Sequence, residues 1–68
     1  MNLKGEIIRI LTKHTGINFA QLWLYLLEVD VTITYEAIHS ELEILESHKV
    51  VTCQIGNTSL NDVWTLVK

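Results

Sequence analysis

The hydrophobic pattern of residues 34 to 51 has a helical period until Val50 and Val51 begin a different one, with no Gly or Pro in the run. Thr34 precedes the helical part, and its side-chain oxygen can accept a hydrogen bond from a free N–H of the first turn. At about 100° per residue, one face is apolar and the opposite face is polar. The two faces are Tyr35, Ile38, Leu42 and Leu45, and Glu36, Ser40, Glu43 and Ser47. The pattern predicts a helix from Tyr35 to about His48 that leads directly into a β-strand.

The length of the chain, 68 residues, predicts a single domain covering residues 1–68. A domain of this size buries only about 60% of the surface that its unfolded chain exposes. Hydrophobic residues make up 49% of the sequence. Either the core is unusually dense or some apolar surface forms an interface, and we favour the interface.

Charge and cysteine content restrict the class of protein. The net charge of −3 opposes non-specific attraction to phosphates, which counts against nucleic-acid binding without excluding it. Cys53 is the only cysteine, so no intrachain disulfide can form, and we expect it to be a small buried residue of a strand. No signal segment is recognisable, and the longest apolar run, Leu22 to Leu27, is far shorter than a membrane span. We expect a cytoplasmic protein without membrane association.

Two further helices are predicted in the first half of the chain. Residues Asn2 to His14 place their apolar side chains on one face, and Gly16 is a suitable helix terminator. Ile17 then forms a short extended link. Asn18 can cap a second helix from about Phe19 to Glu28.

The second predicted helix is apolar around nearly its whole circumference. Such a helix must be buried from more than one side, and three short helices can cover only part of it. We therefore expect Leu24, Tyr25 and Leu27 to contact a partner, with Trp23 in the same interface. Packing is also the stronger interpretation of Trp64, in preference to base stacking.

The remaining segments predict a connection and a C-terminal hairpin. Val29 to Ile33 has a brief alternation typical of a strand, but its position between two helices favours a turn or extended connection. Val50 to Ile55 and Val63 to Val67 are predicted strands. Between them, Gly56-Asn57 indicates a two-residue turn, whereas Asn61-Asp62 is compatible with a bulge or a longer loop.

This order of elements resembles the winged helix-turn-helix family. The residues that carry the resemblance are the first helix to His14, Ile17-Asn18-Phe19, Leu22 and Leu26, Thr34 to Ile38, and Leu42 and Leu45 followed by His48 to Val51. The family often has Leu-x-x-Leu-x-x-x-Gly-hydrophobic at this last point, and the chain has Lys49 in place of Gly. A non-Gly residue is disfavoured at positive φ, so the helix exit departs from the family pattern. The resemblance implies a mainly α fold with a C-terminal β-hairpin, in the form of three helices plus a wing.

The resemblance also implies that the third helix and the wing contact DNA. The corresponding residues are Tyr35, Glu36, His39, Ser40, Glu43, Lys49, Asn57 and Thr58. The outward face of the helix contains no Arg, Asn or Gln, and its glutamates oppose approach to phosphates. Arg9 and Lys13 lie one turn apart on the first helix, and we expect them on a solvated face with Glu6 as a partner of Arg9.

The sequence offers little basis for catalysis. His39, His48 and Cys53 are metal-compatible, but their spacing resembles no compact zinc arrangement, so we expect no metal and no cofactor. No phosphate-binding loop or nucleophile motif is present. So small a domain has little room for a substrate cleft. We expect neither enzymatic activity nor a small-molecule substrate.

Two functional hypotheses follow. The first is a small winged-helix transcriptional regulator that binds DNA as a homodimer, with the second helix contributing to the dimer. The alternative is a winged-helix module that binds and modulates a protein partner through its apolar second helix or its acidic third helix.

Overall fold

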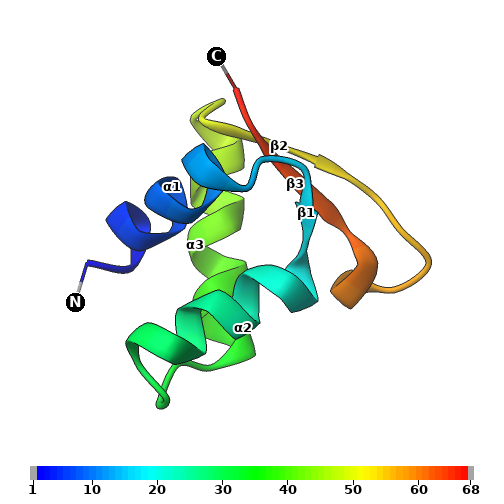
Figure 1. Ribbon diagram of the computed structural model, residues 1–68. Coiled ribbons are helices and arrows are strands. Elements are labelled where there is room, and N and C mark those ends of the chain that lie inside the picture. The colour runs from blue at the N-terminus through cyan, green and yellow to red at the C-terminus, as the bar shows by residue number, and fades with distance from the viewer. Residues whose placement is uncertain (1, 68) are drawn as a thin grey trace.

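Three helices and one small antiparallel sheet make up the computed structural model of the chain (Figure 1). The structure describes residues 2–67, except for the side chain of Ser59. The elements are α1 (Leu3–Lys13), β1 (Ile17–Asn18), α2 (Phe19–Val29), α3 (Tyr35–Ser47), β2 (Val51–Gln54), the 3-10 helix η1 (Ser59–Asn61) and β3 (Val63–Leu66). The fold is mainly helical, as predicted.

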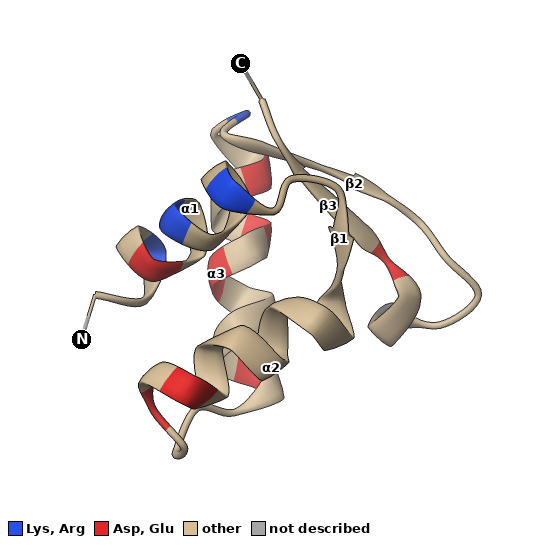
Figure 2. Ribbon diagram, viewed as in Figure 1, with Lys and Arg blue, Asp and Glu red and all other residues tan. Residues whose placement is uncertain are grey.

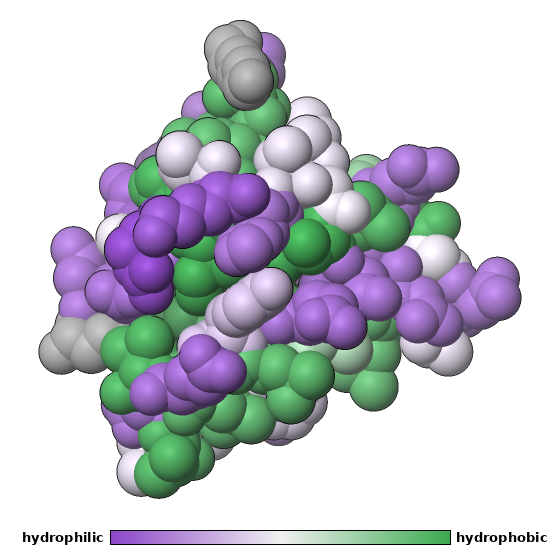
Figure 3. Space-filling view, in the orientation of Figure 1, coloured by the Kyte–Doolittle hydropathy of each residue, from purple (hydrophilic) through white to green (hydrophobic). Residues whose placement is uncertain are grey.

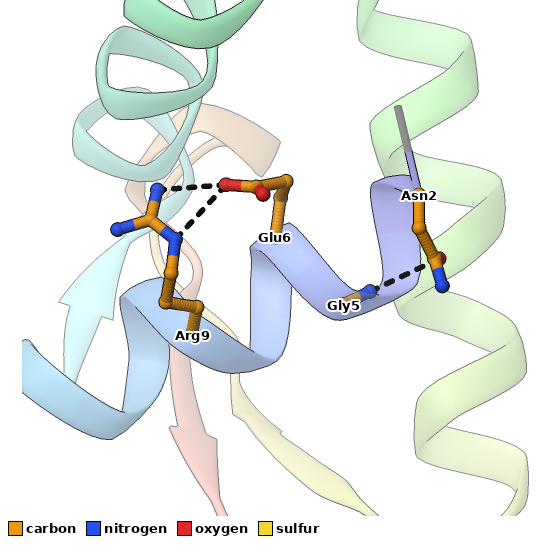
Figure 4. Close-up of polar contacts among 4 residues, drawn as sticks. All are labelled: Asn2, Gly5, Glu6 and Arg9. Carbon is orange, nitrogen blue, oxygen red and sulfur yellow. Dashed lines mark hydrogen bonds and ion pairs between the residues drawn. The ribbon is translucent and has the colours of Figure 1, made fainter.

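Each α-helix begins after a polar residue that caps its first turn. Asn2 Oδ1 accepts from Gly5 N at 3.2 Å (Figure 4), Asn18 Oδ1 from Gln21 N at 2.8 Å, and Thr34 Oγ1 from Ala37 N at 3.2 Å. These bonds satisfy N–H groups that have no partner within the helix. The predicted caps Asn18 and Thr34 are confirmed, whereas Asn2 lies outside the helix that we expected it to begin.

The core is formed by one apolar face from each helix together with the sheet. Its residues are at most 3% exposed: Ile7, Ile10, Leu11, Phe19, Leu22, Leu26, Ile38, Leu42, Leu45, Val51 and Trp64. Each α-helix contributes three of these residues, and their helical spacing places them on one side of the helix. The predicted apolar face of α3 is confirmed at Ile38, Leu42 and Leu45, and Tyr35 is half-buried at its edge.

The exit of α3 is a Schellman motif with lysine at the left-handed position. Lys49 has a φ of 61°. Lys49 N donates to Glu46 O at 2.9 Å, and Val50 N donates to Leu45 O at 2.9 Å, so both backbone donors after the helix return to its last turn. The exit therefore has the geometry usually provided by glycine, although an L-residue occupies the position.

The sheet has three strands in the order β1-β3-β2, and the expectation of a two-stranded hairpin is corrected in this respect. Ile17 pairs with Trp64 and Asn18 with Val63, so the predicted extended link is a short edge strand. Gly16 N donates to Trp64 O at 3.1 Å, which continues the pairing beyond the strand. β2 pairs with the other edge of β3, from Val51 opposite Leu66 to Gln54 opposite Val63.

The connection between β2 and β3 is longer than a two-residue turn, so the prediction at Gly56-Asn57 is wrong and the longer-loop alternative is correct. The loop runs from residue 55 to residue 62 and includes η1. Asp62 Oδ1 accepts from Gly56 N at 2.9 Å and holds the two ends of the loop together. A Cβ at Gly56 would lie 2.5 Å from Asn61 O, so close backbone approach requires glycine there.

The segment between α2 and α3 is a turn, as favoured from its position, and not a strand. Asp30 Oδ1 accepts from Thr32 N at 2.9 Å and from Thr32 Oγ1 at 2.6 Å. Ile33 N donates to Asp30 O at 3.2 Å. These bonds to Thr32 lower the pKa of Asp30, because they stabilise its charged form.

Candidate interaction surfaces

An apolar groove lies between α2 and the loop that follows β2. Its lining consists of Ala20, Trp23, Leu24, Leu27 and Leu60, and its volume is about 290 Å³. Leu24 is 58% exposed on α2, and Leu60 is 42% exposed on η1. In the space-filling view, apolar residues are visible in the lower part of the picture, where α2 and the turn after it lie (Figure 3). An exposed apolar groove is therefore a candidate docking site.

Three of the four predicted interface residues contribute to the groove. Leu24 is largely exposed, whereas Trp23 and Leu27 are half-buried and form part of the lining. Leu60 was not predicted, because the sequence around it indicated only a turn. The signal that could have identified it is a single leucine within the polar run from Asn57 to Asp62.

The remaining predicted interface residue, Tyr25, packs within its own chain. Its ring stacks on the imidazole of His14, with centroids 4.7 Å apart and planes 9° apart. The contact joins the C-terminal end of α1 to the middle of α2. Tyr25 lies outside the lining of the groove, so it does not belong to this candidate surface.

An aromatic cluster supports the groove from the side of α3. The Tyr35 ring lies 5.0 Å from Phe19 and 6.0 Å from Trp23, and it stacks on His39 at 5.6 Å. Trp23 Nε1 is buried and has no hydrogen-bond partner within the described residues. The contacts fix the Trp23 ring through its apolar surface, and they hold Tyr35 against α2 instead of leaving it free on the surface.

The predicted DNA-contacting residues lie in three regions of the structure: on α3, just after its C-terminal end, and on the loop after β2. Glu36, Ser40 and Glu43 are exposed on α3, together with the partly exposed His39. Lys49 follows the opposite end of this helix from Tyr35, about 20 Å away at 1.5 Å per residue. Asn57 and Thr58 are exposed on the loop after β2.

A second, polar pocket of about 190 Å³ lies between α3 and the sheet. Its lining residues are His39, Glu43, Glu46, Cys53, Ile55, Asp62 and Trp64. His39 Nδ1 lies 3.3 Å from Glu43 Oε1. Burial raises the pKa of the Cys53 thiol, with further contributions from Asp62 and Glu46, so the thiol is a poor nucleophile. No group of three His, Cys, Asp or Glu residues in the described chain could hold a metal ion.

Lys and Arg residues lie mainly on α1, whereas acidic residues predominate on α3 (Figure 2). The cations of the first half of the chain, Lys4, Arg9 and Lys13, are exposed on α1. Arg9 Nη2 lies 2.7 Å from Glu6 Oε1, which confirms the predicted pair (Figure 4). Exposed pairs of this kind contribute only about 0–1 kcal/mol. The outer face of α3 is acidic, and the lining of the groove on α2 has no charged residue.

Comparisons with known proteins identify no relative. No protein-family model matches the chain, and neither a curated protein nor a solved structure is significantly similar to it. Among the described residues, no helix has the length and apolar character that crossing a membrane requires.

Proposed function

We propose that the chain is a winged-helix domain that acts as a protein-interaction module, with the groove between α2 and η1 as its docking surface. The winged-helix assignment is supported by the order of three helices followed by two strands and by the strand order β1-β3-β2. In this assignment, residues 55–62 form the wing. A fold alone does not establish a function, so the proposal depends on the surfaces that the domain exposes.

The exposure of Leu24 at the groove is the observation that carries this proposal. Leu24 is 58% exposed beside four further apolar side chains of the same groove. Full burial of a leucine side chain contributes about 1.5–3 kcal/mol. A partner that covered Leu24 and Leu60 would gain part of this free energy at each residue, without removing a charge from water.

DNA binding as a homodimer is a second candidate, favoured by the layout of the helices and by the exposed cations of α1. Glu36 and Glu43 on the exposed face of α3 work against it, because they would face phosphates or base edges. The lining of the polar pocket beside α3 includes Glu43, Glu46 and Asp62 and contains no Lys or Arg. We therefore rank DNA binding after protein binding.

Two variants with matched exposure test the docking surface. Leu24→Glu introduces a charge into the groove, and Ile44→Glu introduces one on α3, where Ile44 is 49% exposed. We expect tagged wild-type protein and Ile44→Glu to retain the same protein partner, and Leu24→Glu to lose it while keeping its helical circular dichroism spectrum. Equal retention by all three proteins would refute the groove as the docking surface.

A titration of the protein with duplex DNA at low salt tests the second candidate. Binding through phosphates should weaken steeply with added salt, and Arg9→Glu, Lys13→Glu or Lys49→Glu should weaken it further. An absence of binding at low salt would remove this candidate and leave the protein-interaction proposal unaffected.

A further inference from the structure

We propose that the groove is occupied by a second copy of this chain, packed antiparallel along α2 about a two-fold axis beside Leu24. The inference rests on the proposed use of the groove and adds the identity and orientation of its occupant.

The spacing of the apolar residues on α2 fits a helix–helix contact. Ala20, Leu24 and Leu27 follow one another at intervals of four and three residues, which is the spacing of a coiled-coil seam. Ala20 is small and allows close approach of a second helix. Leu24 is central in the seam and is exposed, so a two-fold axis beside it would bring the two Leu24 side chains together.

The charge on α2 selects the antiparallel orientation. Glu28 is exposed in the last turn of α2, where the helix dipole disfavours an anion, and this turn contains no basic residue. The first turn of α2 contains no acidic residue. An antiparallel pair centred on Leu24 places Glu28 opposite Ala20 of the second copy, next to the positive end of that helix. A parallel pair would instead place Glu28 beside Glu28.

The third helix, α3, is less suited to contact with an identical copy. The chain carries a net charge of −3, and α3 exposes Glu36, Glu43 and Glu46. A two-fold contact through this face would bring like charges together. By contrast, α2 is free of charge along its ribbon until Glu28 near its C-terminal end (Figure 2).

The limited area of the α2 seam leads us to expect a reversible dimer. A standard interface buries about 800 Å² on each partner, which is close to a fifth of the 4315 Å² surface of this chain. The α2 seam provides only part of such an area, and Leu60 of η1 extends it on one side. We therefore expect the dimer to form with increasing protein concentration.

Light scattering over a range of concentrations tests self-association. We expect the mass to rise from 7.8 kDa to twice that value for the wild type and for Ile44→Glu, and to remain monomeric for Leu24→Glu. A wild-type monomer at every concentration would overturn the inference, as would a dimer that Leu24→Glu leaves intact. Retention of a different protein by the groove would in that case preserve the proposed function, so the two failures are distinguishable.

Cysteine cross-linking tests the orientation in a Cys53→Ser background, with oxidised glutathione as the oxidant. Leu24→Cys should form a disulfide-linked dimer, and the control Ile44→Cys should not. When Ala20→Cys and Glu28→Cys proteins are mixed, we expect the mixed disulfide to predominate. Predominant Ala20→Cys homodimers would indicate parallel helices and would overturn the antiparallel arrangement.

Discussion

The imidazole of His14 lies flat against the ring of Tyr25, with centroids 4.7 Å apart and planes 9° apart. His14 directly follows α1, and Tyr25 is in the middle of α2, so the stack fixes the end of one helix against the next. Tyr25 is half-buried in this contact and lies outside the lining of the groove.

The stack predicts a favourable coupling between these two residues. Aromatic pairs contribute about 0.5–1.5 kcal/mol beyond area burial. Urea unfolding of His14→Ala, Tyr25→Ala and the double variant should give a coupling free energy in this range. Additive effects of the two substitutions would show that the stack makes no energetic contribution.

Lys49→Gly should stabilise the protein by about 1 kcal/mol, because a left-handed conformation costs an L-residue about 1–2 kcal/mol and glycine avoids most of this cost. The φ of 61° at Lys49 is the structural basis. Lys49→Ala serves as the control, since it removes the same side chain but keeps a Cβ, and it should leave the urea midpoint nearly unchanged. Equal stabilisation by both variants would attribute the effect to charge instead of to the backbone.

Two glycine-to-alanine substitutions should have opposite effects on the free energy of unfolding. A Cβ at Gly56 would lie 2.5 Å from Asn61 O, a backbone atom, so Gly56→Ala should destabilise the loop. A Cβ at Gly5 in α1 would have its nearest contact at 3.5 Å, with the Asn2 side chain. Gly5→Ala should therefore stabilise the helix by about 0.5–1 kcal/mol. Urea unfolding that gave both changes the same sign would contradict this prediction.

Protonation of Asp30 should account for part of the decrease in the free energy of unfolding in acid. The side-chain and backbone hydrogen bonds from Thr32 lower the pKa of Asp30 in the folded protein. Its contribution is therefore present above the unfolded-state pKa and is lost as the pH falls through the folded-state value. Urea midpoints measured from about pH 6 to pH 2 should fall less steeply for Thr32→Ala, which lacks the hydroxyl donor. Parallel profiles for the two proteins would argue against this bond.

The helices could be predicted from the sequence because their signals are local. Asn18 and Thr34 each precede a run that favours a helix, and each cap bonds to a backbone N–H three residues later. The period of Ile38, Leu42 and Leu45 is likewise contained within one helix. The exit of α3 was not predicted in this way: Lys49 in place of glycine indicated a departure from the family pattern, yet Lys49 adopts the left-handed conformation, with a φ of 61°.

The sheet and the groove depend on contacts between distant residues, and local patterns do not specify these. Ile17 becomes a strand residue because Trp64 lies opposite it, and two residues alone give no alternation. In the loop after β2, Asp62 Oδ1 accepts from Gly56 N, a bond between residues six apart that a two-residue turn pattern does not indicate. Leu60 joins the candidate site only because η1 folds against α2. The apolar circumference of α2 indicated an interface, but it did not indicate which of its residues the chain would cover.

Glu28→Lys should change folding and self-association in opposite directions. Within one chain, the introduced ammonium group would lie near the negative end of the α2 dipole, where a cation is favourable by about 0.3–1 kcal/mol. In the antiparallel dimer, the same side chain would lie beside the positive end of the second α2 and weaken association. Thermal unfolding at low concentration should therefore shift upward, while light scattering should show dimer formation only at higher concentration than for the wild type. Glu28→Gln should give smaller changes in the same directions. A higher stability with unchanged dimer formation would contradict the antiparallel contact, because only that contact places residue 28 at the other helix's N-terminus.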